Sequence, residues 1–397
     1  MSQRGHIIRP SGARKTWSIL YRNPDDGPQC WEGKFSTKGE AQGRLTEVLG
    51  EIKKGTFARP TSITFEKFSE TWLEGRRKIR GSTESGYGSL IKRQLVPHLG
   101  AFRIAEIRLE HIEAAVSGMI EDELAPKTIH NCVTLLRTML AGKKGGSAAR
   151  RRLLFIDPTL GLELPPLTAS QIMPPTPEQT WALINAAKEI GGIGYAMTYL
   201  GAFTGLRRNE ALALRFSDID WFEHEINVRH AISKRRGQDG AHKWEWHLGP
   251  PKSRKSFRKI AATESLMHLL ADLKTRAKSD FVFPDESGSF IDPDKFNAEI
   301  WKPVPERAGL PGTRFHDLRH FFASQLIANG ETAAFVRDQM GHSSIKVTFD
   351  TYGHLFPGRG KEASGRYEKA MEQARGKTEP VVSNPLAIAS GSRESVS

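Results

Sequence analysis

The sequence is poor in the residues that build covalent or metal-bound frameworks. Among its 397 residues only two are cysteines, Cys30 and Cys132. A disulfide-stapled secreted domain contains more cysteines, and a thiolate zinc site needs closely spaced pairs. The cysteine content therefore argues against both and fits a reducing compartment.

Long apolar runs are also missing. No hydrophobic stretch approaches the ~18 residues that a membrane-spanning helix needs. The first residues, MSQRGHIIRPSGARK, lack the apolar segment of a signal peptide. We therefore expect a soluble, cytoplasmic protein that does not cross a membrane.

Acidic residues are outnumbered by basic ones. The chain has 58 Lys and Arg against 45 Asp and Glu, a formal net charge of +13. Such an excess favours a polyanionic partner, with nucleic acid as the first expectation and an anionic membrane surface as the second. A hydrophobic fraction of 38% is sufficient for folded cores, and the length is typical of two or three domains.

Two domains are predicted before residue 165. Residues 1–60 hold two apolar-aromatic runs around the turn NPDDGP and a helical pattern over 38–54, which predict a small β-rich domain. Residues 61–164 have helical periodicity, with Thr64 as the first N-cap. The basic stretch AGKKGGSAARRRL and the proline-rich segment after it predict a flexible connection, which leaves the boundary near residues 143–152 undefined.

A mixed domain is predicted over residues 174–374. Thr176 begins a capped helix, three strands follow in the middle, and residues 250–256 are expected at a hairpin tip. Residues 375–397 lack periodicity and are predicted to be a disordered tail. The expected fold class is multidomain α+β: a β-rich N-terminal domain, a helical domain, and a mainly α domain with a small antiparallel sheet.

Arginine and histidine side chains in the third domain suit phosphate chemistry. Attack on a phosphodiester places negative charge on the non-bridging oxygens, and arginine meets that charge with a bidentate fork. Arg207 lies in TGLRRNE and Arg319 in HDLRH, although each alone is more typical of a protein surface. His316 shares a helix face with Arg319, and His342 could donate to a phosphoryl oxygen.

A zinc site is the alternative for this segment. His316 and His320 have i, i+4 spacing, but the pattern is not H-E-x-x-H and Arg319 lies between them. A cation beside an arginine is poorly placed, so we expect no metal.

Three more residues could take part in the same chemistry. Lys252, at the predicted hairpin tip, could protonate a departing alkoxide. Glu210 follows Arg207 by three residues and could orient a cation or simply cover the helix surface. Tyr352 has a phenol whose ordinary pKa is near ~10, and as phenolate it could attack phosphorus and form a covalent phosphotyrosine. The alternative for Tyr352 is a core residue with a hydrogen-bonded hydroxyl.

The order and spacing of these segments resemble the tyrosine recombinase, or phage integrase, family. TGLRRNEALAL resembles the family's first arginine box and PKSRKSFRKIA its lysine hairpin, while HDLRHFFASQLIANG and MGHSSIKVTFDTYGHLF resemble its second box. Residues 61–140 are similar to the family's helical core-binding domain. Residues 1–60 are similar to its three-stranded arm-binding domain, whose sheet would present candidate DNA contacts at Arg14, Lys15, Arg22 and Lys34.

The resemblance implies a role for each site residue. It implies that the scissile phosphate is bound and activated by Arg207, His316, Arg319 and His342. Lys252 would protonate the leaving 5′ oxygen, Glu210 would order the site, and Tyr352 would form a 3′-phosphotyrosyl link. The resemblance further implies a nucleoid-associated homo-tetramer on specific double-stranded attachment sites, with no cofactor or ATP. An excisionase or a host DNA-bending protein would be a further partner.

Three other functions share parts of this pattern. A Xer-type resolution recombinase usually lacks the basic β-rich N-terminus. A catalytically inactive DNA-binding regulator would not need the complete residue set. A type IB topoisomerase shares the chemistry, whereas a recombinase exchanges strands between two specific sites. We therefore expect a site-specific integrase of a phage or other mobile element.

Overall fold

The computed structural model describes most of the chain in two compact units. The described residues are 5–11, 15–22, 29–54, 61–76, 79–142, 147–151, 153–154, 156–167, 172–237, 244–356 and 360–378. One unit comprises Met1–Ser170 with Ile232–Gly249, and the other comprises Gln171–Ala231 with Pro250–Ser397. No helix in these residues is long and apolar enough to cross a membrane.

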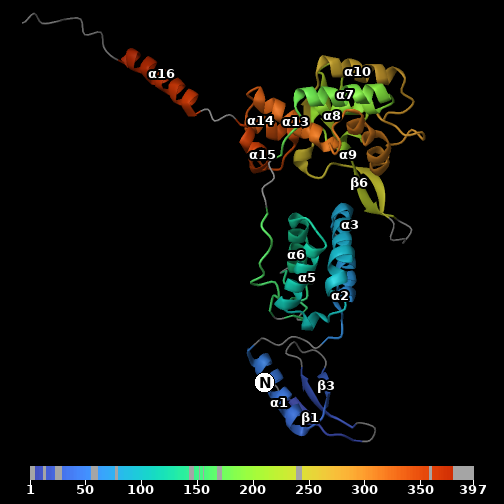
Figure 1. The fold of residues 1–397 in the computed structure, drawn as a ribbon, viewed down its shortest axis with the longest axis vertical. Helices are drawn as coiled ribbons and strands as arrows, with labels where there is room; N and C mark the ends of the chain where they lie inside the picture. The colour runs from blue at the N-terminus through green and yellow to red at the C-terminus, as the bar shows by residue number, and fades with distance from the viewer. Residues whose placement is uncertain are drawn as a thin grey trace, which may run out of the picture. The chain divides into compact units, whose positions relative to one another are not determined.

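The N-terminal part of the first unit is a three-stranded antiparallel sheet with one helix packed on it (Figure 1). Its elements are β1 (Gly5–Ile8), β2 (Trp17–Arg22), β3 (Gln29–Phe35) and α1 (Lys38–Lys54). Ile19 and Tyr21 alternate along the central strand β2 and are buried against Leu45 and Val48 of α1. The alternation therefore places one face of the sheet in a core of its own. The predicted turn and Arg14 lie outside the described residues.

Helices over residues 65–140 of the first unit surround a separate core. They are α2 (Phe65–Glu74), α3 (Gly81–Leu90), the π-turn η1 (Ile91–Leu95), α4 (Val96–Leu99), the short η2 (Ile104–Glu106), α5 (Leu109–Glu121) and α6 (Pro126–Leu140). Thr64 caps α2 as predicted, because its hydroxyl accepts the Lys67 N–H at 3.4 Å. Phe65, Phe68 and Trp72 lie on one face of α2 and are fully or almost fully buried.

The predicted flexible connection after α6 is wrong for residues 147–151 and 153–154. Ser147 and Ala148 are fully buried, and the Ala148 N–H donates to the Met139 carbonyl at 2.9 Å. Leu153 and Leu154 join the helical core. Burial of these apolar side chains outweighs the local preference of glycine and arginine for open loops. Residues 143–146 and 152 lie outside the described part of the chain.

The second unit is mainly helical, with one small sheet. In chain order its elements are α7 (Pro177–Ile190), α8 (Gly194–Thr204), α9 (Arg208–Ala211), η3 (Phe216–Asp218), β4 (Ile219–Asp220), β5 (Glu225–Val228), η4 (Arg254–Ser256), β8 (Arg258–Ala261), α10 (Glu264–Thr275), α11 (Pro293–Lys295), η5 (Phe296–Trp301), α12 (Pro303–Arg307), α13 (Phe315–Ala328), α14 (Ala333–Met340), α15 (Ile345–Tyr352), η6 (Gly353–Leu355) and α16 (Gly360–Thr378). Thr176 and Gln179 form the predicted capping box of α7. Helix α8 packs against α7 and α13.

The strands differ from the prediction in how they pair. β4, β5 and β8 form an antiparallel sheet, whereas β6 (Ala231–Arg236) pairs with β7 (Trp244–Gly249) in a separate ribbon of the first unit. Residues 250–256 therefore join two sheets, and the predicted hairpin tip is wrong. Pro250 and Pro251 follow β7 directly, and proline has no N–H to extend a strand ladder.

The expected fold class is confirmed. The N-terminal sheet, the helical segment and the mainly helical unit with a small antiparallel sheet follow in the predicted order. Helix α16 continues to Thr378, so residues 375–378 of the predicted tail are helical. Residues 379–397 lie outside the described part.

Candidate active site

The site begins where α8 ends. Gly205 adopts the left-handed conformation with φ 59° and closes α8, so that the chain turns sharply into α9. Arg207 is the N-cap of α9, and its backbone N–H donates to Glu210 Oε2 at 3.1 Å. The Arg207 guanidinium donates to Glu210 Oε1 at 2.8 Å, while its side chain stays 36% exposed. Arg207 is therefore held at its base and still open to an incoming anion.

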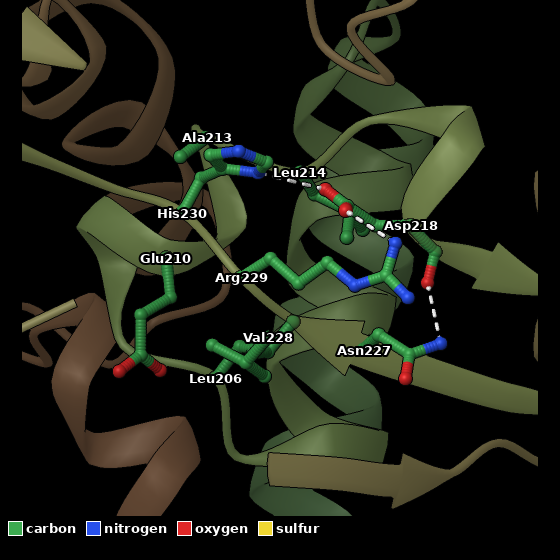
Figure 2. A pocket seen from close by; sticks show the side chains of 9 residues that line it. All are labelled: Leu206, Glu210, Ala213, Leu214, Asp218, Asn227, Val228, Arg229 and His230. Carbon is green, nitrogen blue, oxygen red and sulfur yellow. Dashed lines mark hydrogen bonds and ion pairs between the residues drawn. The ribbon is translucent and has the colours of Figure 1, made fainter. Parts of the chain in front are cut away.

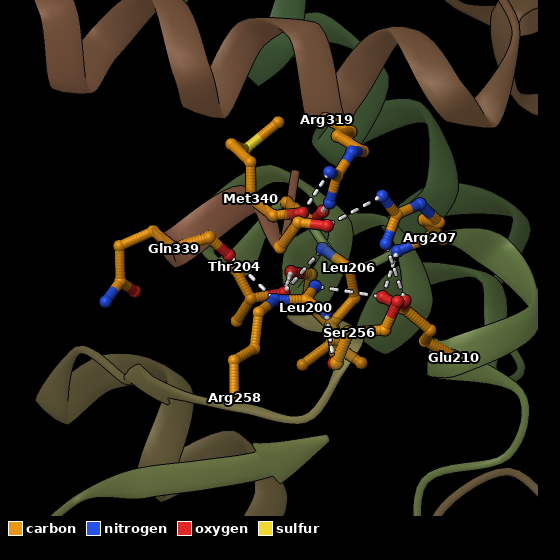
Figure 3. Close-up of polar contacts among 12 residues, drawn as sticks. Leu200, Thr204, Leu206, Arg207, Glu210, Ser256, Arg258, Arg319, Gln339 and Met340 are labelled. Carbon is orange, nitrogen blue, oxygen red and sulfur yellow. Dashed lines mark hydrogen bonds and ion pairs between the residues drawn. The ribbon is translucent and has the colours of Figure 1, made fainter. Parts of the chain in front are cut away.

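Glu210 is the carboxylate at the centre of the site. It is only 5% exposed and also accepts a hydrogen bond from Arg258 Nη2 at 2.9 Å (Figure 3). Burial raises its pKa, but Arg258 above all, and then Arg207 and Arg319, outweigh that effect and lower the pKa to about 2. Glu210 is thus ionised at neutral pH and ties two arginines together.

Arg258 is a site residue that sequence reasoning missed. It begins β8, and its Nε donates to the Gln339 carbonyl at 2.7 Å while Nη1 donates to the Ser256 carbonyl at 3.1 Å. Its side chain is 5% exposed. A signal was present: Arg258 lies two residues before the buried Ile260, so an arginine occupies the inner face of a strand.

Arg319 projects from α13 and is 2% exposed. Its guanidinium donates to the Gly205 carbonyl at 2.6 Å and to the Met340 carbonyl (Figure 3). Burial and the nearby Arg207 and Arg258 lower its pKa to about 9, so Arg319 is still a cation at neutral pH. Crowded cations that repel one another are an arrangement that favours a bound anion.

His342 follows Gly341, which closes α14 in the left-handed conformation. Its Nδ1 lies 3.0 Å from Thr348 Oγ1, and its ring lies nearly parallel to the ring of Tyr352. Burial, followed by Arg319 and Arg207, lowers the pKa of His342 to about 4. The imidazole is therefore neutral at physiological pH and can donate from its other nitrogen.

Tyr352 ends α15 and is 1% exposed. Its hydroxyl oxygen lies 2.8 Å from Nδ1 of His320 on α13. Burial raises the pKa of Tyr352 to about 12, although Arg319 and Arg207 act in the opposite direction. The phenol is thus protonated and enclosed in this structure, next to a histidine that sequence reasoning considered only for metal.

His316 also lies on α13, one turn before His320. The two rings pack edge to face with centroids 4.9 Å apart. His316 remains exposed, yet desolvation of its ring, followed by His320 and Arg319, lowers its pKa to about 4. In the part of the chain that the structure describes, no group of three or more His, Cys, Asp or Glu could hold a metal ion.

The structure records no contact between Lys252 and the other predicted residues among the residues it describes. Lys252 is exposed, and no hydrogen bond or ion pair ties it to another described residue. Lys255, on the same connection, instead donates to the Ser343 carbonyl at 2.8 Å, beside His342. The connection over residues 250–256 therefore contacts the site through Lys255, whereas Lys252 has no recorded partner among the described residues.

Asp218 supports the turn behind Glu210. This buried carboxylate lies 3.2 Å from His230 Nδ1 (Figure 2). It also accepts the Arg215 N–H at 3.3 Å. The Asn227 amide donates to the Asp218 carbonyl at 3.1 Å. These bonds fix η3 against β5.

The candidate DNA contacts of the N-terminal sheet lie apart from this cluster in sequence. Lys15, Arg22 and Lys34 are all exposed. Lys34 has a positive φ of 82° in β3, a conformation that non-glycine residues rarely adopt. Arg22 and Lys34 on the sheet, with Lys15 two residues before β2, therefore present three cations to solvent, which is compatible with contacts to phosphate.

The sequence matches two domain families. Residues 176–359 match the phage integrase family, and residues 64–120 match the N-terminal SAM-like domain of phage integrases. A tyrosine recombinase XerC-like protein of Caldanaerobacter subterraneus is 26% identical over 355 residues, which is 81% of this chain and 87% of that protein. The ICEBs1 integrase of Bacillus subtilis is 27% identical over 268 residues, 64% of this chain and 68% of that protein.

Solved integrase structures share the fold. The Tn1549 transposon integrase in complex with a circular intermediate DNA superposes with a TM-score of 0.63 at 19% identity, covering 78% of this chain and 100% of that one. A lambda integrase tetramer bound to a Holliday junction gives a TM-score of 0.54 at 17% identity, covering 86% of this chain and 93% of that one.

Proposed function

The chain belongs to the phage integrase family, and from that premise we propose that it is a site-specific tyrosine recombinase that integrates or excises a phage or other mobile DNA element. The ICEBs1 and Tn1549 integrases, to which it is similar, are proteins of mobile elements. The observation that carries the proposal is the convergence of Arg207, Arg319, His342 and Tyr352 from four separate segments.

The scissile phosphate binds between the guanidinium groups of Arg207 and Arg319. Glu210 and the carbonyl of Gly205 hold these groups in place before DNA arrives. His316 and the neutral His342 donate to the remaining phosphoryl oxygens. Donors that are fixed in advance need no reorganisation when charge develops on phosphorus, which is the main source of catalysis in such sites.

Cleavage exchanges one phosphodiester for another. The Tyr352 hydroxyl oxygen forms a bond to phosphorus, and the bond between phosphorus and the 5′ oxygen breaks. The 5′ oxygen takes a proton from Lys252, and the DNA keeps a 3′-phosphotyrosyl link. The reverse reaction with the 5′ hydroxyl of another strand completes the exchange, so bond energy is conserved without ATP.

The domains divide the DNA contacts. Residues 61–164 and residues 174–374 each contact core-site DNA, and residues 1–60 bind arm DNA, with Arg14, Lys15, Arg22 and Lys34 as the candidate contacts. The working form is a homo-tetramer on two attachment sites, and an excisionase or host DNA-bending protein sets the direction. The DNA-bound lambda integrase tetramer, which has the same fold, supports the stoichiometry.

A nicked suicide duplex tests the proposal. Its sequence is taken from the DNA that flanks the chain's own coding region, so that cleavage releases a short strand and traps the adduct. We expect wild-type protein to form a covalent adduct and Tyr352→Phe to bind the duplex equally well without forming one. Tyr367→Phe is the matched control, because Tyr367 is 69% exposed on α16 and should react normally.

The position of any adduct decides between the alternatives. Peptide mapping should find the DNA on Tyr352. An adduct that persists in Tyr352→Phe would move the nucleophile elsewhere. Binding without any adduct in the wild-type protein would favour an inactive DNA-binding regulator instead.

A further inference from the structure

His320 is the described side chain that directly contacts the hydroxyl of Tyr352. Its Nδ1 lies 2.8 Å from the phenol oxygen, and the ring centroids are 5.7 Å apart. Both residues are buried, at 7% and 1% exposure. Because both groups are shielded from solvent, neither can replace this contact with a hydrogen bond to water, and the contact is therefore part of the folded structure.

The other histidines of the site are arranged differently. His342 stacks on Tyr352 with a centroid distance of 6.2 Å, and its Nδ1 is engaged with Thr348. His316 packs against His320 and reaches solvent. Within the described residues, His320 is thus the imidazole aimed at the atom that attacks.

We propose that His320 is the proton acceptor of the strand-cleavage step. The inference rests on the proposed function. As Tyr352 Oη bonds to phosphorus, its proton passes to His320 Nδ1, while the departing 5′ oxygen takes a different proton from Lys252. Rejoining reverses both transfers. For this role the neutral ring carries its hydrogen on Nε2, which leaves Nδ1 free to accept.

The surroundings of His320 keep its ring neutral. Burial lowers its pKa below the ordinary value of 6.5, Asp317 opposes this, and Arg314 and Arg319 add to it. The remaining titratable groups that face the ring are its neighbour His316, Tyr352 on α15 and His342 after α14. A base that is neutral at working pH can accept a proton without first losing one.

His320→Asn separates proton acceptance from positioning. The asparagine amide oxygen can take the place of Nδ1 and keep the hydrogen bond to Tyr352, but it cannot carry the proton. In single-turnover cleavage of the suicide duplex we expect a loss of roughly 10²-fold or more with unchanged duplex binding. His268→Asn, on the exposed side of α10, is the matched control and should cleave normally.

The pH profile gives a second readout. The wild-type cleavage rate should rise with pH while His320 loses its proton, and then level off. His320→Asn should lack this contribution and keep only the part due to His316 and His342, whose pKa values are about 4. In His320→Gly, added imidazole should restore part of the rate, because it can occupy the vacated space.

The outcomes are distinct. His320→Asn cleaving within about threefold of wild type, with the same pH profile, would overturn the proton-acceptor role and leave only a hydrogen bond that positions the phenol. A variant that has lost duplex binding or thermal stability would be replaced by His320→Gly, with imidazole rescue deciding the matter. Absence of any Tyr352 adduct in the wild-type protein would instead overturn the proposed function, and this inference with it.

Discussion

At the scale of single residues, Glu210 is the buried carboxylate that balances the charge of Arg207 and Arg258. Its folded-state pKa of about 2 lies below the ordinary 4.5, so between these values the unfolded chain binds more protons than the folded one. The stability that the carboxylate confers is therefore fully present above about pH 4.5 and is lost as the pH falls toward about 2.

Glu210→Gln should reduce the free energy of unfolding by about 3 kcal/mol at neutral pH, because Arg258 stays buried without a counter-ion. The difference from wild type should shrink as the pH falls below about 4.5. Urea denaturation at about pH 7 and about pH 3 measures both values. Glu189→Gln removes an exposed ion pair with Arg307 and should change stability by less than about 1 kcal/mol. Equal effects of the two substitutions would contradict the role of Glu210.

Two lysines on the connection before β8 compete for the role of general acid. Lys252→Ala should slow cleavage by roughly 10²-fold when the leaving group is a 5′ oxygen. Sulfur needs little protonation, so a 5′-thio substrate should restore the rate to within a few-fold of wild type. Lys255→Ala is the matched variant, since Lys255 contacts the Ser343 carbonyl. If the 5′-thio substrate restored the cleavage rate of Lys255→Ala and did not restore that of Lys252→Ala, Lys255 would be the general acid instead of Lys252.

At the scale of elements, glycine at the end of α8 sets the site geometry. A Cβ on Gly205 would lie 2.6 Å from the Phe322 ring, and φ is 59°. Gly205→Ala should therefore destabilise the protein by more than the ~1–2 kcal/mol of left-handed strain alone. It should also slow cleavage at least about tenfold, because the Gly205 carbonyl holds Arg319. Thermal denaturation and the suicide-duplex assay measure the two effects.

Gly192→Ala is the control for backbone strain alone. Gly192 also has a positive φ, 64°, but a Cβ there meets open space. This variant should lose only about 1 kcal/mol and cleave like the wild type. Equal cleavage defects in the two variants would show that the contact with Phe322 is not what matters at Gly205.

Elements with strong local signals were predictable from the sequence. The capping residues Thr64 and Thr176 predicted where two helices begin. The helical spacing of Leu45 and Val48 predicted which face of α1 is buried. Strand pairing was not predictable, because partners are chosen by contacts distant in sequence. The same limit applies to the site. Motifs named Arg207 and Tyr352, and Arg258 had only its position on the inner face of a strand as a signal, whereas the role of His320 becomes visible only when Tyr352 is in place beside it.

At the scale of the whole molecule, the N-terminal sheet is a candidate for independent DNA binding, because it has its own core. Deleting residues 1–60 should leave cleavage of a core site intact and weaken binding to arm DNA. The isolated segment should bind arm duplexes with an affinity that falls as salt rises, since each neutralised phosphate releases counter-ions. Gel-shift titrations at two salt concentrations test both fragments. Unchanged full-site integration after the deletion, with no binding by the isolated segment, would withdraw the arm-binding assignment.

The burial of Tyr352 affects what fraction of the molecules can cleave DNA at a given moment. Because Tyr352 is 1% exposed, we expect a phosphodiester to reach its hydroxyl only in a minor conformer in which the side chains that cover the Tyr352–His320 pair have moved aside while the pair itself stays in contact. A conformer that lies a few kcal/mol above the ground state holds roughly 0.1–10% of the molecules. The cleavage rate scales with that fraction, and only a ligand that binds the open conformer more tightly can raise it. We therefore expect the free protein to be nearly inactive, and DNA that binds the open conformer more tightly to raise the cleavage rate.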